Sequence, residues 1–65
     1  MEALQYKILT YMIEKGFTLN IYIDNDGKVA IGTSKPETPP TLVKEKSLYA
    51  AVIKLANIYD IPYIL

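Results

Sequence analysis

The sequence predicts a small α+β domain in which a two-stranded antiparallel hairpin is covered by two helices, in the chain order α-β-β-α. Two observations predict this class. Apolar residues recur with a helical period near both ends of the chain, and they alternate with polar residues in the middle. No internal repeat or linker divides the 65 residues, so we expect a single domain over residues 1–65.

The first helix is expected over residues 2–15. Leu4, Ile8 and Met12 fall on one side of it at helical spacing. Gly16 follows the last polar residues of this segment, at the position where a left-handed cap is expected. The segment therefore has both an apolar face for a core and a recognisable end.

A hairpin is expected next, because residues 17–24 and 28–33 both alternate apolar with polar side chains around the turn Asn25-Asp26-Gly27. A two-residue turn would place Asp24 opposite an apolar residue on the core face. A three-residue loop with Gly27 in a left-handed conformation pairs Asp24 with Lys28 and pairs apolar residues with each other. We therefore predict the second register.

That register places Tyr22 opposite Ala30, and Asn20 opposite Gly32, on the outer face of the hairpin. A glycine inside a strand often marks the close approach of another backbone. The outer face is then either a solvated surface or a platform for a partner or a second copy. Both interpretations remain open at this point.

Residues 34–41 contain three prolines, which predicts a connecting loop of extended character. Residues 41–43 either add a short third strand or begin the next helix. Ser47 is the expected N-cap of the second helix, with Thr41 as an earlier alternative.

The second helix carries two neighbouring apolar strips, and a two-stranded sheet covers only one of them. The second strip therefore packs on the first helix or on another subunit. The apolar tail, residues 61–65, is either tucked into the core or added to a partner. Because a two-stranded sheet is marginal, we expect it to extend across a dimer. The two strips consist of Leu48, Ala51, Val52, Leu55, Ile58 and Tyr59, and of Tyr49, Ile53 and Ala56.

The composition argues against catalysis, because the chain has no histidine, cysteine, tryptophan or arginine. We expect no enzyme activity, no cofactor and no metal site. Seven basic residues balance seven acidic ones, so nucleic acid is not an expected partner. No apolar run approaches the roughly 20 residues that span a bilayer, and residues 1–5 do not read as a signal peptide. We expect a cytoplasmic protein.

Two short motifs invite chemical interpretations. Asp24-Asn25-Asp26-Gly27 starts like a calcium-binding loop, but Lys35 stands where such a loop needs its final glutamate. A hairpin turn is the favoured interpretation. Lys44-Glu45-Lys46-Ser47 resembles the lysine cluster at the last helix of double-stranded RNA-binding domains. Here the glutamate interrupts the cluster and the chain is neutral, which favours a solvated helix start.

The order of elements also resembles a known family. Gly16-Phe17 enters the hairpin, and Ser47-Leu48-Tyr49-Ala50-Ala51 opens a last helix that continues to Ala56. This arrangement resembles the small ABA-sandwich domains encoded by bacteriophages and prophages. The resemblance implies a phage-type accessory protein that acts in the host cytoplasm, and it offers no active site to carry over to this chain.

Two functions follow as expectations. The first is a small, homo-oligomeric interaction protein that binds or inhibits a host protein, with tyrosines suited to the contact surface. The second is a small-ligand-binding module with a tyrosine-lined pocket between subunits. The candidate partner-binding residues are Tyr22, Asn20, Ala30, Gly32, Tyr49, Ile53 and Tyr63.

Overall fold

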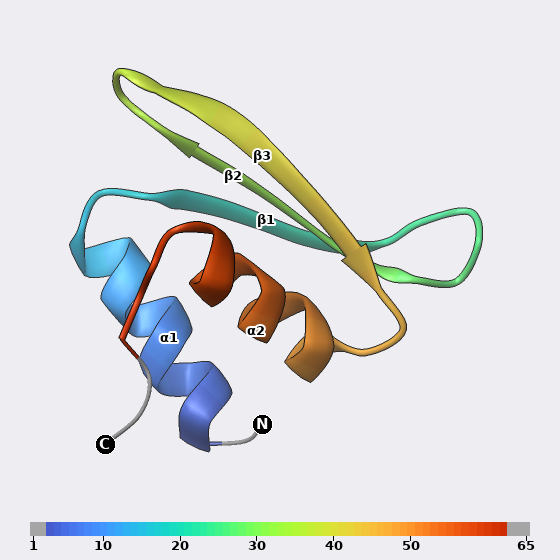
Figure 1. Ribbon diagram of the computed structural model, residues 1–65. Helices are drawn as coiled ribbons and strands as arrows, with labels where there is room; N and C mark the ends of the chain where they lie inside the picture. The colour runs from blue at the N-terminus through green and yellow to red at the C-terminus, as the bar shows by residue number, and fades with distance from the viewer. Residues whose placement is uncertain (1–2, 63–65) are drawn as a thin grey trace.

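The computed structural model describes residues 3–62 of the chain. Its strands form one antiparallel sheet in the order β1-β2-β3, and both helices lie on the same side of that sheet (Figure 1). The predicted α+β class is confirmed, with a third strand added to the expected hairpin. The elements are α1 (Ala3–Glu14), β1 (Thr18–Ile23), β2 (Val29–Lys35), β3 (Thr38–Glu45) and α2 (Leu48–Ile58).

The third strand occupies much of the segment that was expected to be a loop, residues 34–41. Strands β2 and β3 are joined by the two-residue turn Pro36-Glu37. Glu37 has a φ of 66°, as the third residue of a type II turn requires, and proline favours the position before it. Pro39 and Pro40 lie in β3, an edge strand, where a proline is tolerated. The loop expectation was wrong because proline content does not exclude an edge strand.

The predicted register of the first hairpin is confirmed. Ile23 pairs with Val29, and Asp24 donates its backbone N–H to the carbonyl of Lys28 over 2.9 Å. Gly27 takes the expected left-handed conformation, with a φ of 80°. The turn therefore places Tyr22 opposite Ala30, as predicted.

Both helix boundaries carry the local signals seen in the sequence. Ser47 is the N-cap of α2, and its Oγ accepts a hydrogen bond from the backbone N–H of Ala50 over 3.1 Å. The alternative start at Thr41 was wrong, because that residue lies in β3. Gly16 follows α1 with a φ of 97°, which fits the predicted left-handed cap.

The core lies between the two helices and the inner face of the sheet. Part of the C-terminal tail belongs to it, because Ile61 is buried and its N–H bonds the carbonyl of Ala56 over 2.8 Å. Tyr63, one of the predicted contact residues, lies outside the described residues. The largest fully buried side chains are Ile8, Met12, Ile31, Val52 and Leu55.

Candidate functional site

The sheet surface opposite the helices, which we call the outer face, carries four of the predicted contact residues together. They lie in two cross-strand rows that the third strand extends: Lys44 continues the row of Tyr22 and Ala30, and Leu42 continues the row of Asn20 and Gly32. Both helices lie on the other side of the sheet (Figure 1). The outer face is defined here as Asn20, Tyr22, Ala30, Gly32, Leu42 and Lys44.

Two large side chains stand out from this face above two small residues. Tyr22 is 41% exposed and Leu42 is 54% exposed. Ala30 is fully buried although it lies on the outer face, so it shapes the surface rather than touching a partner. A Cβ atom added at Gly32 would lie 4.0 Å from Cδ1 of Leu42, so Leu42 leans toward the glycine. Tyr22 on β1 and Leu42 on β3 therefore flank the small residues Ala30 and Gly32 of the central strand.

An ion pair lies at the end of the outer face that is next to the β1–β2 turn. Nζ of Lys44 lies 3.3 Å from Oδ2 of Asp24, whose side chain is only 9% exposed. Oδ1 of Asp24 accepts backbone hydrogen bonds from Lys28 and Asp26 over 3.0 and 2.9 Å. The hydrogen bond from Lys28, with further contributions from Lys44 and Asp26, lowers the pKa of Asp24 against an opposing desolvation effect. Oδ1 of Asp24 is thus engaged within the β1–β2 turn, and Oδ2 pairs with a lysine of β3.

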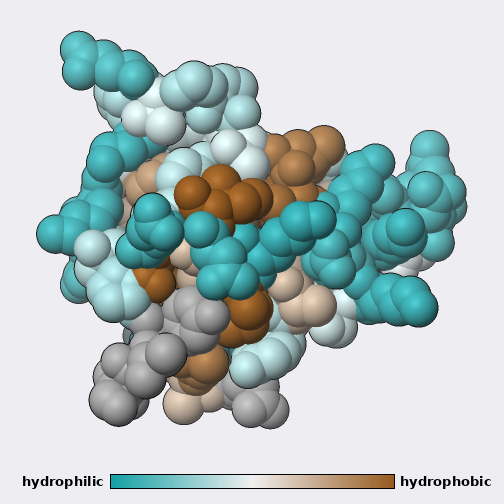
Figure 2. Space-filling view, in the orientation of Figure 1, coloured by the Kyte–Doolittle hydropathy of each residue, from teal (hydrophilic) through white to brown (hydrophobic). Residues whose placement is uncertain are grey.

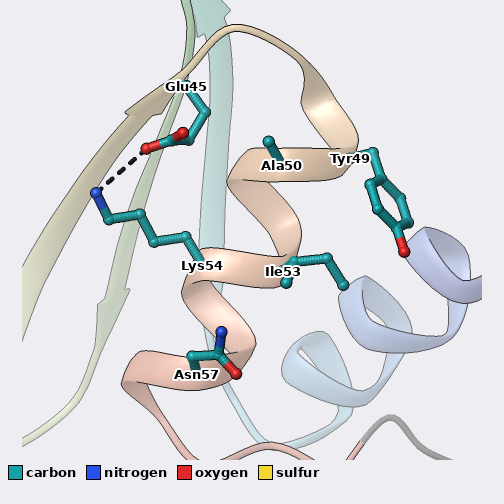
Figure 3. Close-up of a pocket in the computed structure, with 6 residues that line it drawn as sticks. All are labelled: Glu45, Tyr49, Ala50, Ile53, Lys54 and Asn57. Carbon is teal, nitrogen blue, oxygen red and sulfur yellow. Dashed lines mark hydrogen bonds and ion pairs between the residues drawn. The ribbon is translucent and has the colours of Figure 1, made fainter.

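The remaining predicted residues lie on a different surface. Figure 3 shows Tyr49 and Ile53 on the side of α2 that faces α1, at one margin of an open depression of about 470 Å³. At the other margin, Nζ of Lys54 lies 3.2 Å from Oε2 of Glu45. The structure therefore does not join Tyr49 and Ile53 to Tyr22, because the sheet separates the two groups. The depression is lined by Glu45, Tyr49, Ala50, Ile53, Lys54 and Asn57.

One further surface was missed by sequence reasoning. Ile21 and Ile23 lie on the helix-facing side of β1, where the alternating pattern predicts core residues, yet they are 45% and 65% exposed. Figure 2 shows hydrophobic surface near the middle of one face of the molecule, and hydrophilic surface toward the β1–β2 turn. Alternation assigns a residue to a face of the sheet but does not show whether a helix covers it.

The charges near the start of α2 are largely paired within the chain. Lys44 is paired with Asp24, and Lys54 with Glu45. Within residues 3–62, no three acidic, histidine or cysteine side chains gather as a metal site would need. None of the helices in that part of the chain is long and apolar enough to cross a membrane.

Comparisons with known proteins add no assignment. No protein-family model matches the chain, and neither a curated protein nor a solved structure does.

Proposed function

We propose that this chain is a small, non-enzymatic interaction protein that docks a protein partner on the outer face of its sheet. The observation that carries the proposal is the pair Tyr22 and Leu42, both exposed above the small residues Ala30 and Gly32. Tyrosine suits a contact surface because its ring buries a large area at low entropic cost while the hydroxyl finds a polar partner.

The chemistry of the outer face selects the kind of partner. Its centre is apolar, and its one lysine, Lys44, is already paired with Asp24. The partner should therefore offer a flat apolar surface with a hydrogen-bond acceptor for the Tyr22 hydroxyl, rather than a polyanion. The resemblance to phage ABA-sandwich domains adds the proposal that this partner is a host protein and that binding occurs in the host cytoplasm.

The decisive variant is Tyr22→Ala. A protein captured from bacterial lysate on the immobilised chain would be purified, and its Kd measured by calorimetry for the wild type and for two variants. We expect Tyr22→Ala to weaken binding by about tenfold or more, as truncation of a hot-spot tyrosine does. Tyr6→Ala serves as the matched control, because Tyr6 is 65% exposed on α1, away from the outer face.

Two results would overturn this proposal. One is equal weakening by both tyrosine variants, which would remove the outer face from the contact. The other is loss of the folded state in Tyr22→Ala, detected by circular dichroism, because the residue would then act as part of the core.

A second candidate function is the binding of a small flat ligand in the depression beside Tyr49. Its volume of about 470 Å³ lies within the range of about 300–1,000 Å³ typical of ligand pockets. Adenosine is a suitable flat probe. A rise in Tm with adenosine that is absent in Tyr49→Ala would support this function, whereas an unchanged Tm at millimolar adenosine would exclude this ligand.

A further inference from the structure

We infer that a second copy of this chain pairs with the free edge of β1, antiparallel and centred on Ile21, so that two three-stranded sheets become one continuous sheet. This inference goes beyond the proposed function and does not depend on it. It rests on the backbone direction, the side chains and the charge of β1.

The backbone of β1 directs alternate residues toward its free edge. Asp24 donates its N–H to the carbonyl of Lys28 in the neighbouring strand. Opposite residues in an antiparallel pair alternate between hydrogen-bonded and non-hydrogen-bonded positions. Asn20 and Tyr22 therefore bond β2 as Asp24 does. The N–H and C=O groups of Leu19, Ile21 and Ile23 then point away from β2 and are available to another strand.

The opposite edge of the sheet is protected, whereas β1 is not. The same alternation directs the groups of Pro40, Leu42 and Lys44 outward from β3. Pro40 has no N–H to donate, so the outward-facing groups of β3 cannot form a complete hydrogen-bond ladder with another strand. Residues 18–23 contain no proline and no charged side chain. Natural sheets rarely leave an uncharged edge strand without proline unpaired. Of the two edge strands, β1 is therefore the one expected to pair with another chain.

The side chains fit an antiparallel pair centred on Ile21. In this register Ile21 faces Ile21 of the second copy, and Leu19 faces its Ile23, so three hydrogen-bonded pairs form on the helix side. On the outer face, Asn20 faces Tyr22 of the second copy. Centring the pair on Tyr22 instead would leave Leu19 without a partner inside the strand. The proposed register covers Ile21, Tyr22 and Ile23, which are 45%, 41% and 65% exposed.

The two-fold axis of this pair is perpendicular to the sheet, so the helices of both copies lie on the same side. The two outer faces then form one surface. Tyr22 of each copy lies diagonally across the junction, at a spacing of about 7–8 Å that aromatic side chains can bridge. The platform for a protein partner would double in width without any change within either copy.

Charge and area set the expected strength of the pair. The chain has a formal net charge of zero, so two copies do not repel each other. The contact is one strand of about 20 Å, which is narrower than interfaces that bury about 1,600 Å². We therefore expect a dimer that dissociates on dilution, in the micromolar range, rather than an obligate one.

The first test is the mass of the full chain by sedimentation across a concentration series. Ile21→Lys sets two like charges opposite each other at the two-fold axis, and we expect the dimer Kd to rise at least about tenfold. Leu42→Lys is the matched control. It adds the same charge at a residue of similar exposure, 54%, on β3, and we expect no effect on the Kd. Circular dichroism checks that both variants stay folded.

A mixing experiment tests the register directly, because position 21 faces itself only in the proposed pair. Ile21→Lys and Ile21→Glu should each be mainly monomeric alone and should associate when mixed, since opposite charges then lie across the axis. If the mixed chains do not associate while the wild type does, the register is wrong.

Hydrogen exchange gives an independent readout on the wild-type protein. The amides of Leu19, Ile21 and Ile23 should become more protected as concentration rises, whereas those of Leu42 and Lys44 should not change. A wild type that stays monomeric at millimolar concentration would overturn the inference, as would protection that grows at β3 instead. Binding of a captured partner, measured with Tyr22→Ala and Tyr6→Ala, is scored separately, so either proposal can fail without the other.

Discussion

The hydroxyl of Tyr59 donates a hydrogen bond of 2.7 Å to Oγ1 of Thr41, which joins the end of α2 to the edge strand β3. Its oxygen also lies 3.0 Å from Oγ1 of Thr33 in the central strand. The ring of Phe17 contacts the Tyr59 ring edge-on, with 4.9 Å between the centroids. The Tyr59 side chain thus connects the end of α2 to strands β2 and β3 and to Phe17, the residue that precedes β1.

Replacing Tyr59 by phenylalanine keeps the ring and removes the hydroxyl. Because Thr33 is buried and loses a polar neighbour, we expect Tyr59→Phe to lower the free energy of unfolding by about 1–2 kcal/mol in urea titrations. Tyr22→Phe is the control, since Tyr22 is half-exposed on the outer face. The urea midpoint of this variant should hardly differ from that of the wild type. Equal effects of the two variants would mean that the network around Tyr59 adds nothing to stability.

Loss of the N-cap should weaken the second helix. In Ser47→Ala the N–H of Ala50 loses its side-chain acceptor, which we expect to cost about 1 kcal/mol of unfolding free energy. Ser34→Ala removes the same hydroxyl from an exposed strand position, and thermal melts should show little change. A larger loss in Ser34→Ala than in Ser47→Ala would contradict the role of the cap.

The turn between β2 and β3 holds a non-glycine residue in a left-handed conformation, because Glu37 has a φ of 66°. Glycine adopts this conformation without the steric cost of a Cβ, so we expect Glu37→Gly to raise the unfolding free energy by about 1 kcal/mol. Glu37→Ala keeps the Cβ and should bring no such gain. Chemical denaturation of both variants separates backbone strain from the loss of a charge.

Acid should weaken the first hairpin through Asp24. Its pKa is lowered from 3.8 in the folded chain, with the backbone N–H of Lys28 as the largest cause. A carboxyl with a depressed folded pKa stabilises the fold above its unfolded pKa and loses this contribution as the pH falls through the folded value. We therefore expect wild-type stability to decline below about pH 4, and to decline less in Asp24→Asn.

Asp26→Asn is the matched control for the acid experiment, because it removes a carboxylate from the same turn and leaves the bonds to Asp24 in place. Its stability should follow the wild-type pH dependence in thermal melts. A flattened pH curve in Asp26→Asn, with the wild-type curve kept in Asp24→Asn, would assign the pH dependence to Asp26 and contradict the prediction.

Features set by neighbours in the sequence were predictable. The register of the first hairpin follows from a single choice at Asp24, because a shift by one residue would place a charge on the core face. The cap at Ser47 follows from the residue itself and the apolar strip after it. In both cases the competing interactions lie within a few residues of each other along the chain.

Features set by distant contacts were left undecided by the sequence, which offered a third strand near residues 41–43 only as one of two alternatives. Strand β3 forms because residues 38–45 pair with β2, and its prolines, which suggest a loop, are tolerated at a sheet edge. The outer face gains Leu42 only through this pairing. The exposure of Ile21 depends on where the helices lie over the sheet, which alternation along β1 does not specify.

The sequence by itself determined the α+β class and the first hairpin with its register, and it favoured Ser47 as the start of α2. Each depends on local spacing, turn geometry and the separation of apolar from polar faces. Only the tertiary structure decided that a third strand joins the sheet, that Ile61 enters the core, and that β1 stays an open edge. These outcomes depend on which distant surfaces come together, because burial and edge pairing are properties of the whole packed chain.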